Sequence, residues 1–222
     1  GLIEEFCKKN KIEYRKIKEY HSPRASFTSF LYGMIKILGP ILPINDAEVY
    51  ESINQLKEIS LRISSKNLNE NNPALELAKW ISDTPIIYYP FGFQAAAIRF
   101  KNSMQENAKM HAMIEDVIET CHNGIVAWEE FSNFKPILIQ GFDDHKKTKE
   151  RWKILKEFFE KEKIEYKEIN SVKGNILSKI INLIFQLDYV SIYSAILNEK
   201  DPSPVKSIDF IKLRLDKNKE IN

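Results

Sequence analysis

Glycine-rich loops and short catalytic signatures are missing from this chain of 222 residues. Only seven glycines occur, and none stands in a GxGxxG or GxxxxGK arrangement, the loops that bind dinucleotides and nucleotide phosphates. Neither HExxH nor GxSxG is present, so the patterns of zinc peptidases and α/β hydrolases are missing as well. Dehydrogenase, kinase and hydrolase functions therefore lose the motifs that usually support them.

The chain also has little net charge and few cysteines. The 33 basic and 31 acidic side chains leave a formal charge of +2, too small to attract nucleic acid, so we expect no nucleic-acid partner. The two cysteines, Cys7 and Cys121, lie far apart without CxxC spacing, which indicates a reducing compartment, by default the cytoplasm. His111 and His122 lack the spacing of a helical ligand pair, and no cysteine or carboxylate cluster completes a shell. We predict no metal site and no cofactor.

Long uncharged runs are missing too. The longest, Thr84–Ile98, contains Pro85, Pro90 and Gln94 and is shorter than the roughly 20 residues that a membrane-spanning helix needs. We therefore expect no membrane segment. The hydrophobic content of 43% is nevertheless enough for a substantial core in a chain of this length.

The first twenty residues have the pattern of a helix end followed by an alternating stretch. Gly1 is not an initiator methionine, and the charges within residues 2–10 interrupt what would be the apolar core of a signal peptide. Residues 12–20 alternate like a short strand. Because one αβ unit cannot cover a sheet alone, we expect missing upstream sequence or a covering chain. A short amino-terminal cap is the alternative.

Strand and helix patterns alternate from residue 73 onward. Strands separated by helices imply a parallel sheet with helices on both faces, so we predict an α/β fold. The predicted buried strands are residues 85–89, 136–139 and 164–169. The predicted helices of this part begin near residues 73 and 92 and span 145–163, 176–197 and 205–215, after an earlier helix over 46–65.

Two candidate proton-transfer groups lie in the middle of the chain. General acid–base chemistry needs one group that accepts a proton from carbon and one that exchanges protons with oxygen, which suits Glu106 and His122. A continuous helix would hold them roughly 24 Å apart. Either the chain breaks after Lys109 and folds back, or the two groups come from different subunits. Residues 110–120 lack helical periodicity, which favours a break, and we expect a new short helix near Asn123.

Arg24 is the third candidate. Ser22 and Pro23 suit the cap and first position of a helix that runs to Leu38, which places Arg24 in the first turn. Free N–H groups and the helix dipole favour anions there, so a cation has no helix-stabilising role. Arg24 is therefore either a surface arginine paired with a carboxylate or a residue that recognises an anion or enolate.

Several motifs resemble one known family. Arg99–Asn102, Glu106–Lys109 and His122–Trp128 resemble the R-x-K-N, N-E-N-A-K and H-N-E-I-x-G-W patterns of bifunctional phosphoglucose/phosphomannose isomerases, which are sugar isomerase (SIS) domain proteins. The resemblance covers nearly the whole chain in the correct order. It extends to Ser22–Ala25, Asp143–His145, Leu187–Ser191, Asp201–Val205 and Ile208–Lys212.

This resemblance implies a three-layer αβα parallel sheet of SIS type with long carboxy-terminal helices. Residues 1–44 would be the tail of a first SIS-like half plus a linker helix, and residues 45–222 a second SIS-like domain. The implied activity is an aldose–ketose isomerase that interconverts glucose 6-phosphate and fructose 6-phosphate through a cis-enediol, with mannose 6-phosphate as a further candidate substrate. The implied protein is a cytoplasmic homodimer.

The same resemblance implies roles for four residues. Glu106 would move the proton between C2 and C1, and His122 would open the sugar ring from across a dimer interface. Arg24 would stabilise the enediolate charge, and Lys212 would lie near the sugar ring. A partly desolvated carboxylate and a fixed cation near developing charge fit this chemistry.

The chain also departs from the family pattern. Gln105, Cys121 and Gly124 replace commoner residues. The Ser/Thr-rich S-x-S-G-N-T loop that grips the substrate phosphate is missing, so we expect little turnover from these 222 residues alone. Two functions stay open: the carboxy-terminal portion of a sugar-phosphate isomerase, or a non-catalytic SIS-like module that binds a sugar phosphate or a partner chain.

Overall fold

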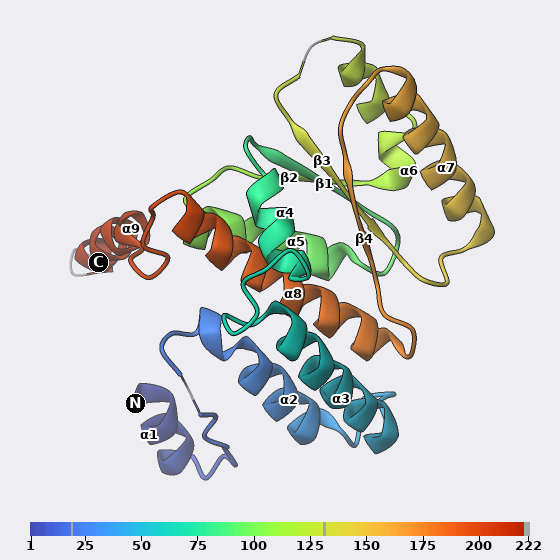
Figure 1. Ribbon diagram of the computed structural model, residues 1–222. Coiled ribbons are helices and arrows are strands. Elements are labelled where there is room, and N and C mark those ends of the chain that lie inside the picture. The colour runs from blue at the N-terminus through green and yellow to red at the C-terminus, as the bar shows by residue number, and fades with distance from the viewer. Residues whose placement is uncertain (19, 131, 220–222) are drawn as a thin grey trace. The chain divides into compact units, whose positions relative to one another are not determined.

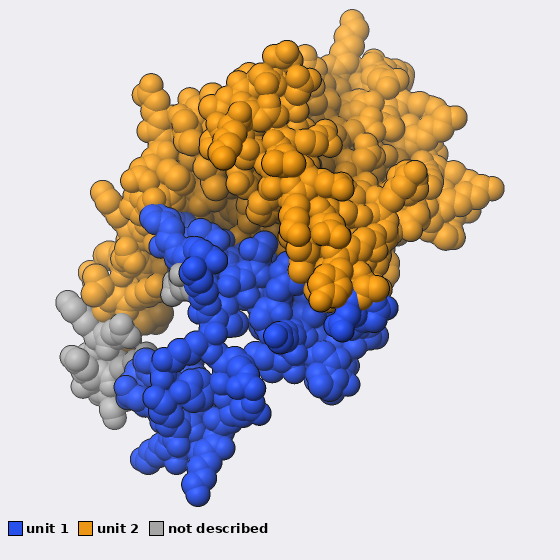
Figure 2. All heavy atoms as spheres, turned by 60° about the horizontal axis from the view of Figure 1, so that its bottom comes forward, with its two compact units in different colours: residues 1–46 blue, residues 47–222 orange. Residues whose placement is uncertain are grey.

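The computed structural model describes residues 1–18, 20–130 and 132–219. Of residues 216–219 it describes the backbone alone. The chain divides into two compact units, Gly1–Asp46 and Ala47–Asn222 (Figure 2). That the first unit is the tail of a preceding SIS-like half stays a prediction.

The first unit consists of helices and a segment, residues 12–18, without regular secondary structure. Its helices are α1 (Leu2–Lys9), the 3₁₀ turn η1 (Arg24–Ser26) and α2 (Phe27–Leu38). The backbone N–H of Ala25 donates to Ser22 Oγ at 3.4 Å, although the residue at the cap position of this turn is Pro23 and not Ser22 as predicted.

The predicted strand over residues 12–20 is wrong, because residues 12–18 and 20 form no strand. A strand needs a neighbour to pair with, and the described part of the first unit contains none. Instead the segment is held by side chains: Lys16 forms an ion pair with Glu4 at 3.1 Å, and Ile17 packs against Gly33 of α2.

A four-stranded parallel sheet forms the centre of the second unit (Figure 1). The strands lie in the order β2-β1-β3-β4, and in the register of the two central strands Ile87 is paired with Ile137. All five residues of β1 are buried, as expected for a strand covered on both faces. The strands are β1 (Pro85–Tyr89), β2 (Met113–Asp116), β3 (Lys135–Gln140) and β4 (Lys167–Asn170).

Helices cover both faces of this sheet, which confirms the predicted three-layer α/β fold. Alternate residues of the central strands face a core that contains Trp152 and Phe159 of α7 (Lys146–Lys161) on one side. On the other side, α4 (Pro73–Trp80) and α5 (Gln94–Ser103) pack against α8 (Ile176–Leu197). The helix α3 (Asp46–Ile63) joins this side through a hydrogen bond from Asn175 to Glu51 at 2.8 Å.

The long helix α8 is apolar enough to cross a membrane by length and composition alone. In this fold 12 of its 22 residues are buried, among them polar side chains such as Lys179, Asn182 and Ser191. Lys179 Nζ is paired with Asp143 at 2.6 Å. The helix therefore forms the core of its own domain, and a core helix passes the same composition test.

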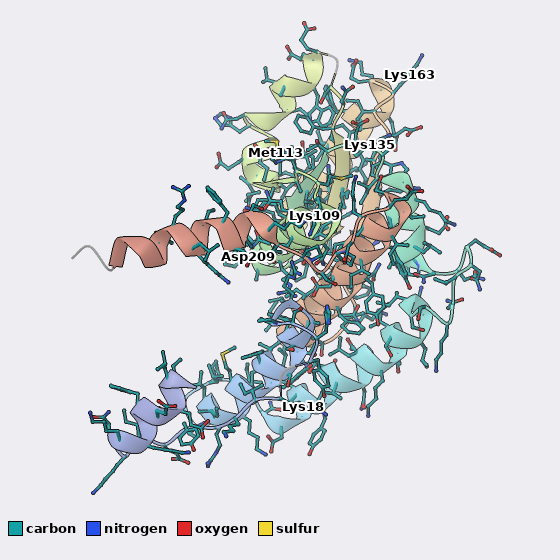
Figure 3. All side chains as sticks on the ribbon, turned by 90° about the vertical axis from the view of Figure 1, so that its left-hand side faces the viewer. Lys18, Lys109, Met113, Lys135, Lys163 and Asp209 are labelled. Atoms are coloured by element: carbon teal, nitrogen blue, oxygen red, sulfur yellow. The ribbon has the colours of Figure 1, made fainter. Side chains whose placement is uncertain are left out.

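The last helix, α9 (Lys206–Lys219), has a different environment. Every side chain from Lys206 to Leu215 is exposed. Figure 3 shows α9 standing away from the other helices of its unit, with its side chains projecting into open space.

The one strand that sequence patterns miss is β2. It contains Glu115 and Asp116, and Met113 is exposed, so it has no apolar run to mark it. Since β2 is the edge strand of the sheet, pairing on one side only is enough to form it. The expected break after Lys109 is confirmed, because this strand and the short helix α6 (Val117–Thr120) follow it.

Candidate active site

Glu106 lies in a π-turn, η2 (Met104–Ala108), which continues α5. The turn ends at Lys109, which has the left-handed backbone angles φ 56° and ψ 32°. Single π-turns within α-helices occur frequently at functional sites. The backbone at Glu106 is therefore unlike that of the helix before it.

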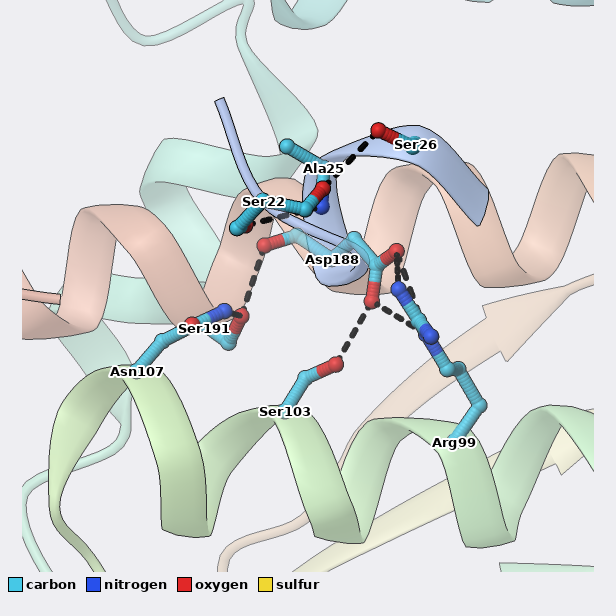
Figure 4. Close-up of polar contacts among 8 residues, drawn as sticks. All are labelled: Ser22, Ala25, Ser26, Arg99, Ser103, Asn107, Asp188 and Ser191. Carbon is cyan, nitrogen blue, oxygen red and sulfur yellow. Dashed lines mark hydrogen bonds and ion pairs between the residues drawn. The ribbon is translucent and has the colours of Figure 1, made fainter. Parts of the chain in front are cut away.

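Polar side chains fix α5 and η2 to α8 (Figure 4). The guanidinium of Arg99 donates to both carboxylate oxygens of Asp188, with Nη2 at 2.8 Å from Oδ2 and Nε at 3.1 Å from Oδ1. Ser103 Oγ donates to the same carboxylate at 2.6 Å, and Asn107 Nδ2 donates to Ser191 Oγ at 2.8 Å. These contacts hold the helix that carries Glu106.

A hollow of about 560 Å³ opens beside Glu106. Lys109 crosses its rim, since Nζ donates to the carbonyl of Glu106 at 2.5 Å and to that of Pro204 at 2.7 Å (Figure 3). The residues that line the hollow come from η2 and its cap, from the segment that leads into α9 and from the first turn of α9: Gln105, Glu106, Lys109, Lys200, Asp201, Pro204, Val205, Lys206, Ser207 and Ile208.

His122 lies in the loop between α6 and the 3₁₀ helix η3 (Gly124–Glu129), whose start confirms the short helix expected near Asn123. The side chain of His122 is exposed, and its backbone N–H donates to Glu119 O at 2.9 Å. Glu106 precedes the amino end of β2, whereas His122 follows its carboxyl end. Within one chain the two groups therefore lie at opposite ends of that strand.

Trp128 anchors the segment that carries His122. Its indole Nε1 donates to the hydroxyl of Tyr88 in β1 at 2.9 Å, and its ring meets Phe159 edge-on at 5.4 Å. Trp128 is 8% exposed, and Tyr88 is fully buried. Burial raises the pKa of Tyr88 far above its usual range, so this hydroxyl stays neutral and keeps accepting the bond.

Comparison with known proteins identifies the family of this chain. The profile described as "Bacterial phospho-glucose isomerase C-terminal SIS domain" matches residues 70–215. The chain belongs to this family. The bifunctional phosphoglucose/phosphomannose isomerases of Caldicellulosiruptor bescii and Aquifex aeolicus are 32% and 26% identical over 97% and 98% of the chain. The chain spans 66% of the length of each.

Two solved structures share the fold. A glucose-6-phosphate isomerase-like protein from Thermus thermophilus superposes with a TM-score of 0.65 at 17% identity, covering 82% of this chain and 59% of its own. The C-terminal domain of a glucosamine-fructose-6-phosphate aminotransferase from Francisella tularensis gives a TM-score of 0.50 at 15% identity, covering 81% and 53%. The SIS-type fold expected from the motifs is thereby confirmed.

The four residues that the motifs point to lie on four different elements of the chain. Glu106 lines the hollow, and His122 lies at the far end of β2. Lys212 is an exposed residue of α9, about one turn beyond Ile208, the last residue of that helix that lines the hollow. Arg24 lies in η1 of the first unit, a 3₁₀ turn that precedes α2, and not in the first turn of the helix that runs to Leu38 as predicted, because that helix begins at Phe27. Their roles in turnover stay predictions.

Glu115 is a site-flanking residue that the sequence gives no signal for. A side chain at Gly124 would collide with the Glu115 carboxylate, so that carboxylate fills the space beside Gly124. Burial raises the pKa of Glu115, and the nearby Glu119 raises it further.

Metal-ligand clusters are not found in the part of the chain that the structure describes. Within residues 1–18, 20–130 and 132–215, no three His, Cys, Asp or Glu side chains lie close enough together to hold an ion.

Proposed function

We propose that this chain is the carboxy-terminal portion of a sugar-phosphate isomerase that interconverts glucose 6-phosphate and fructose 6-phosphate. Mannose 6-phosphate is a second proposed substrate, and the compartment is the cytoplasm. One observation carries the proposal: within the family-matched segment, Glu106 stands on a π-turn at the rim of a hollow large enough for a hexose phosphate.

In the proposed reaction, the Glu106 carboxylate takes the proton from C2 of the open-chain aldose and returns it to C1. The intermediate is a cis-enediol: O1 gains a proton as it forms, and O2 loses its hydroxyl proton as it collapses to the ketose. Both hydrogens therefore move from position 2 to position 1, and no external oxidant or reductant is needed. His122 exchanges a proton with the ring oxygen during ring opening. Arg24 stabilises the developing oxyanion, and Lys212 contacts the sugar ring.

A homodimer completes this site. Glu106 and His122 lie at opposite ends of β2, so we propose that each site combines Glu106 of one chain with His122 of a second copy. A two-fold symmetric interface would create two such sites per dimer. The exposed position of His122 on a firmly anchored loop supports this arrangement.

The activity is tested with Glu106→Gln in the full-length protein. Loss of the general base is expected to lower kcat by at least ~100-fold in a coupled assay for fructose 6-phosphate. Glu157→Gln, the same change at an exposed position of α7, is the matched control and should keep wild-type kcat. Near wild-type turnover by Glu106→Gln would reject the role of Glu106. Sugar-phosphate binding without turnover in the wild-type protein would favour the non-catalytic module.

The shared site is tested by mixing two inactive variants, Glu106→Gln and His122→Gln, after dissociation and reassembly. A mixed dimer of this kind regains one site with both native groups, so an equal mixture should recover roughly a quarter of wild-type activity. If both groups acted within one chain, every site would keep one defect. No recovery would then be observed, although the mixed dimer forms.

A further inference from the structure

The π-helical winding of η2 places Asn107 on the same face of the helix as Arg99 and Ser103. In an α-helix each residue advances by about 100°, so Asn107 would lie roughly 80° away from the direction of Arg99 after two turns. In a π-turn the hydrogen bonds span five residues, and each residue advances less. The backbone N–H of Lys109 accordingly donates to Met104 O, and that of Met110 does so at 3.2 Å. Asn107 thereby returns to the face that carries Arg99 and Ser103.

These three side chains meet two residues of α8. Asp188 accepts the Arg99 fork and the Ser103 hydroxyl, as described above. Ser191 Oγ accepts from Asn107 Nδ2 at 2.8 Å and donates to the carbonyl of Asp188 at 2.7 Å. Ser191 is fully buried and Asn107 is 8% exposed, so water cannot replace either partner without cost.

We propose that Ser191 and Asp188 are positioning residues that hold the π-turn and thereby set the direction of Glu106. Neither residue lines the hollow, so neither is placed to touch the substrate. Glu106 directly precedes Asn107, and rewinding of the turn to an α-helix would rotate both residues together. Asn107 would then leave Ser191, and Glu106 would leave its place at the rim. The kinetic part of this inference rests on the proposed isomerase function.

The structural test compares Ser191→Ala with Ser194→Ala in the full-length protein. Both serines are fully buried in α8, but Ser194 Oγ has no hydrogen-bond partner among the described residues, which makes it a matched control. The amide protons of Lys109 and Met110 report on the π-turn, because both donate to Met104 O. Their hydrogen exchange is expected to be about 10-fold faster in Ser191→Ala and unchanged in Ser194→Ala.

The same exchange rate in both variants would overturn the inference. Should Ser191→Ala fail to fold, Asn107→Ala removes the same hydrogen bond from its donor side and carries the same expectation. Exchange at Ile137 in the buried strand β3 reports global stability, and it should be accelerated less than exchange at Lys109 and Met110 in either variant.

The kinetic test asks whether Ser191 acts through Glu106. Ser191→Ala is expected to lower kcat about 10-fold with KM changed less than about twofold. In a Glu106→Gln background it should lower kcat no further, since a misdirected base is already lost. Equal factors in both backgrounds would identify Ser191 as merely structural and overturn the inference. Absence of isomerase activity in the wild-type protein would reject the proposed function, while the exchange experiment would still decide this one.

Discussion

The segments of Glu106 and His122 are held by different kinds of contact. The π-turn of Glu106 is fixed by directional polar bonds to Asp188 and Ser191, whereas the loop of His122 is fixed by the packing of Trp128. Polar bonds define the rotation of a helix about its axis, and aromatic packing defines where a loop lies. The side chain of Glu106 thus has a set direction, and the exposed imidazole of His122 has a set location.

The largest loss of stability should come from removing the buried ring of Trp128. Trp128→Ala is expected to lower the free energy of unfolding by about 3–5 kcal/mol, the usual cost of removing a buried tryptophan. Urea titration measures it, with Val126→Ala as control, because Val126 is an exposed residue of the same η3. Equal losses in the two variants would contradict an anchoring role for Trp128.

The Arg99–Asp188 pair should contribute less to the free energy of unfolding than Trp128 does. Asp188→Ala is expected to cost about 2 kcal/mol, below the 3–5 kcal/mol typical of a fully buried pair, because the Arg99 and Asp188 side chains keep 22% and 20% exposure. Glu76→Ala, which breaks an exposed pair with Lys79, is the control and should cost less than about 0.5 kcal/mol. A cost for Asp188→Ala as small as that of the control would remove the contrast between the two segments.

The hydrogen bond from Trp128 to Tyr88 can be removed without removing the packing of the Trp128 ring. Tyr88→Phe leaves the ring of residue 88 in place but deprives the Trp128 indole of its acceptor, at a cost of about 1 kcal/mol. The measurement is again urea titration. If Tyr88→Phe cost as much as Trp128→Ala, the loop of His122 would also be held by a polar bond, and the comparison would fail.

The smallest effect concerns Glu115. Burial raises its pKa above the ordinary 4.5, so its contribution to stability is present at low pH and is lost as pH rises through the raised value. Glu115→Gln removes this ionisation and should therefore raise the Tm relative to wild type at pH 7 but not at pH 4. Thermal unfolding at the two pH values measures it. A Tm difference that is larger at pH 4 would contradict the sign.

Sequence patterns predict the centre of this fold because the local pattern and the environment agree there. The apolar runs of β1 and β3 are buried on both faces, and the stripe of α7 places Trp152 and Phe159 inward. The motifs around Glu106 and His122 identify the family, and the missing periodicity after Lys109 predicts the break. Each of these features depends on residues that are near one another in the chain.

Tertiary contacts decided the rest. The strand β2 is polar and forms because β1 offers it a free edge, whereas residues 12–18 alternate correctly and form no strand because their described surroundings offer no edge. The π-turn at Glu106 depends on Asp188 and Ser191, more than 80 residues away in the chain. The sequence by itself determined the elements and the candidate groups. Only packing determined the partners, because pairing and side-chain direction depend on residues that meet after folding.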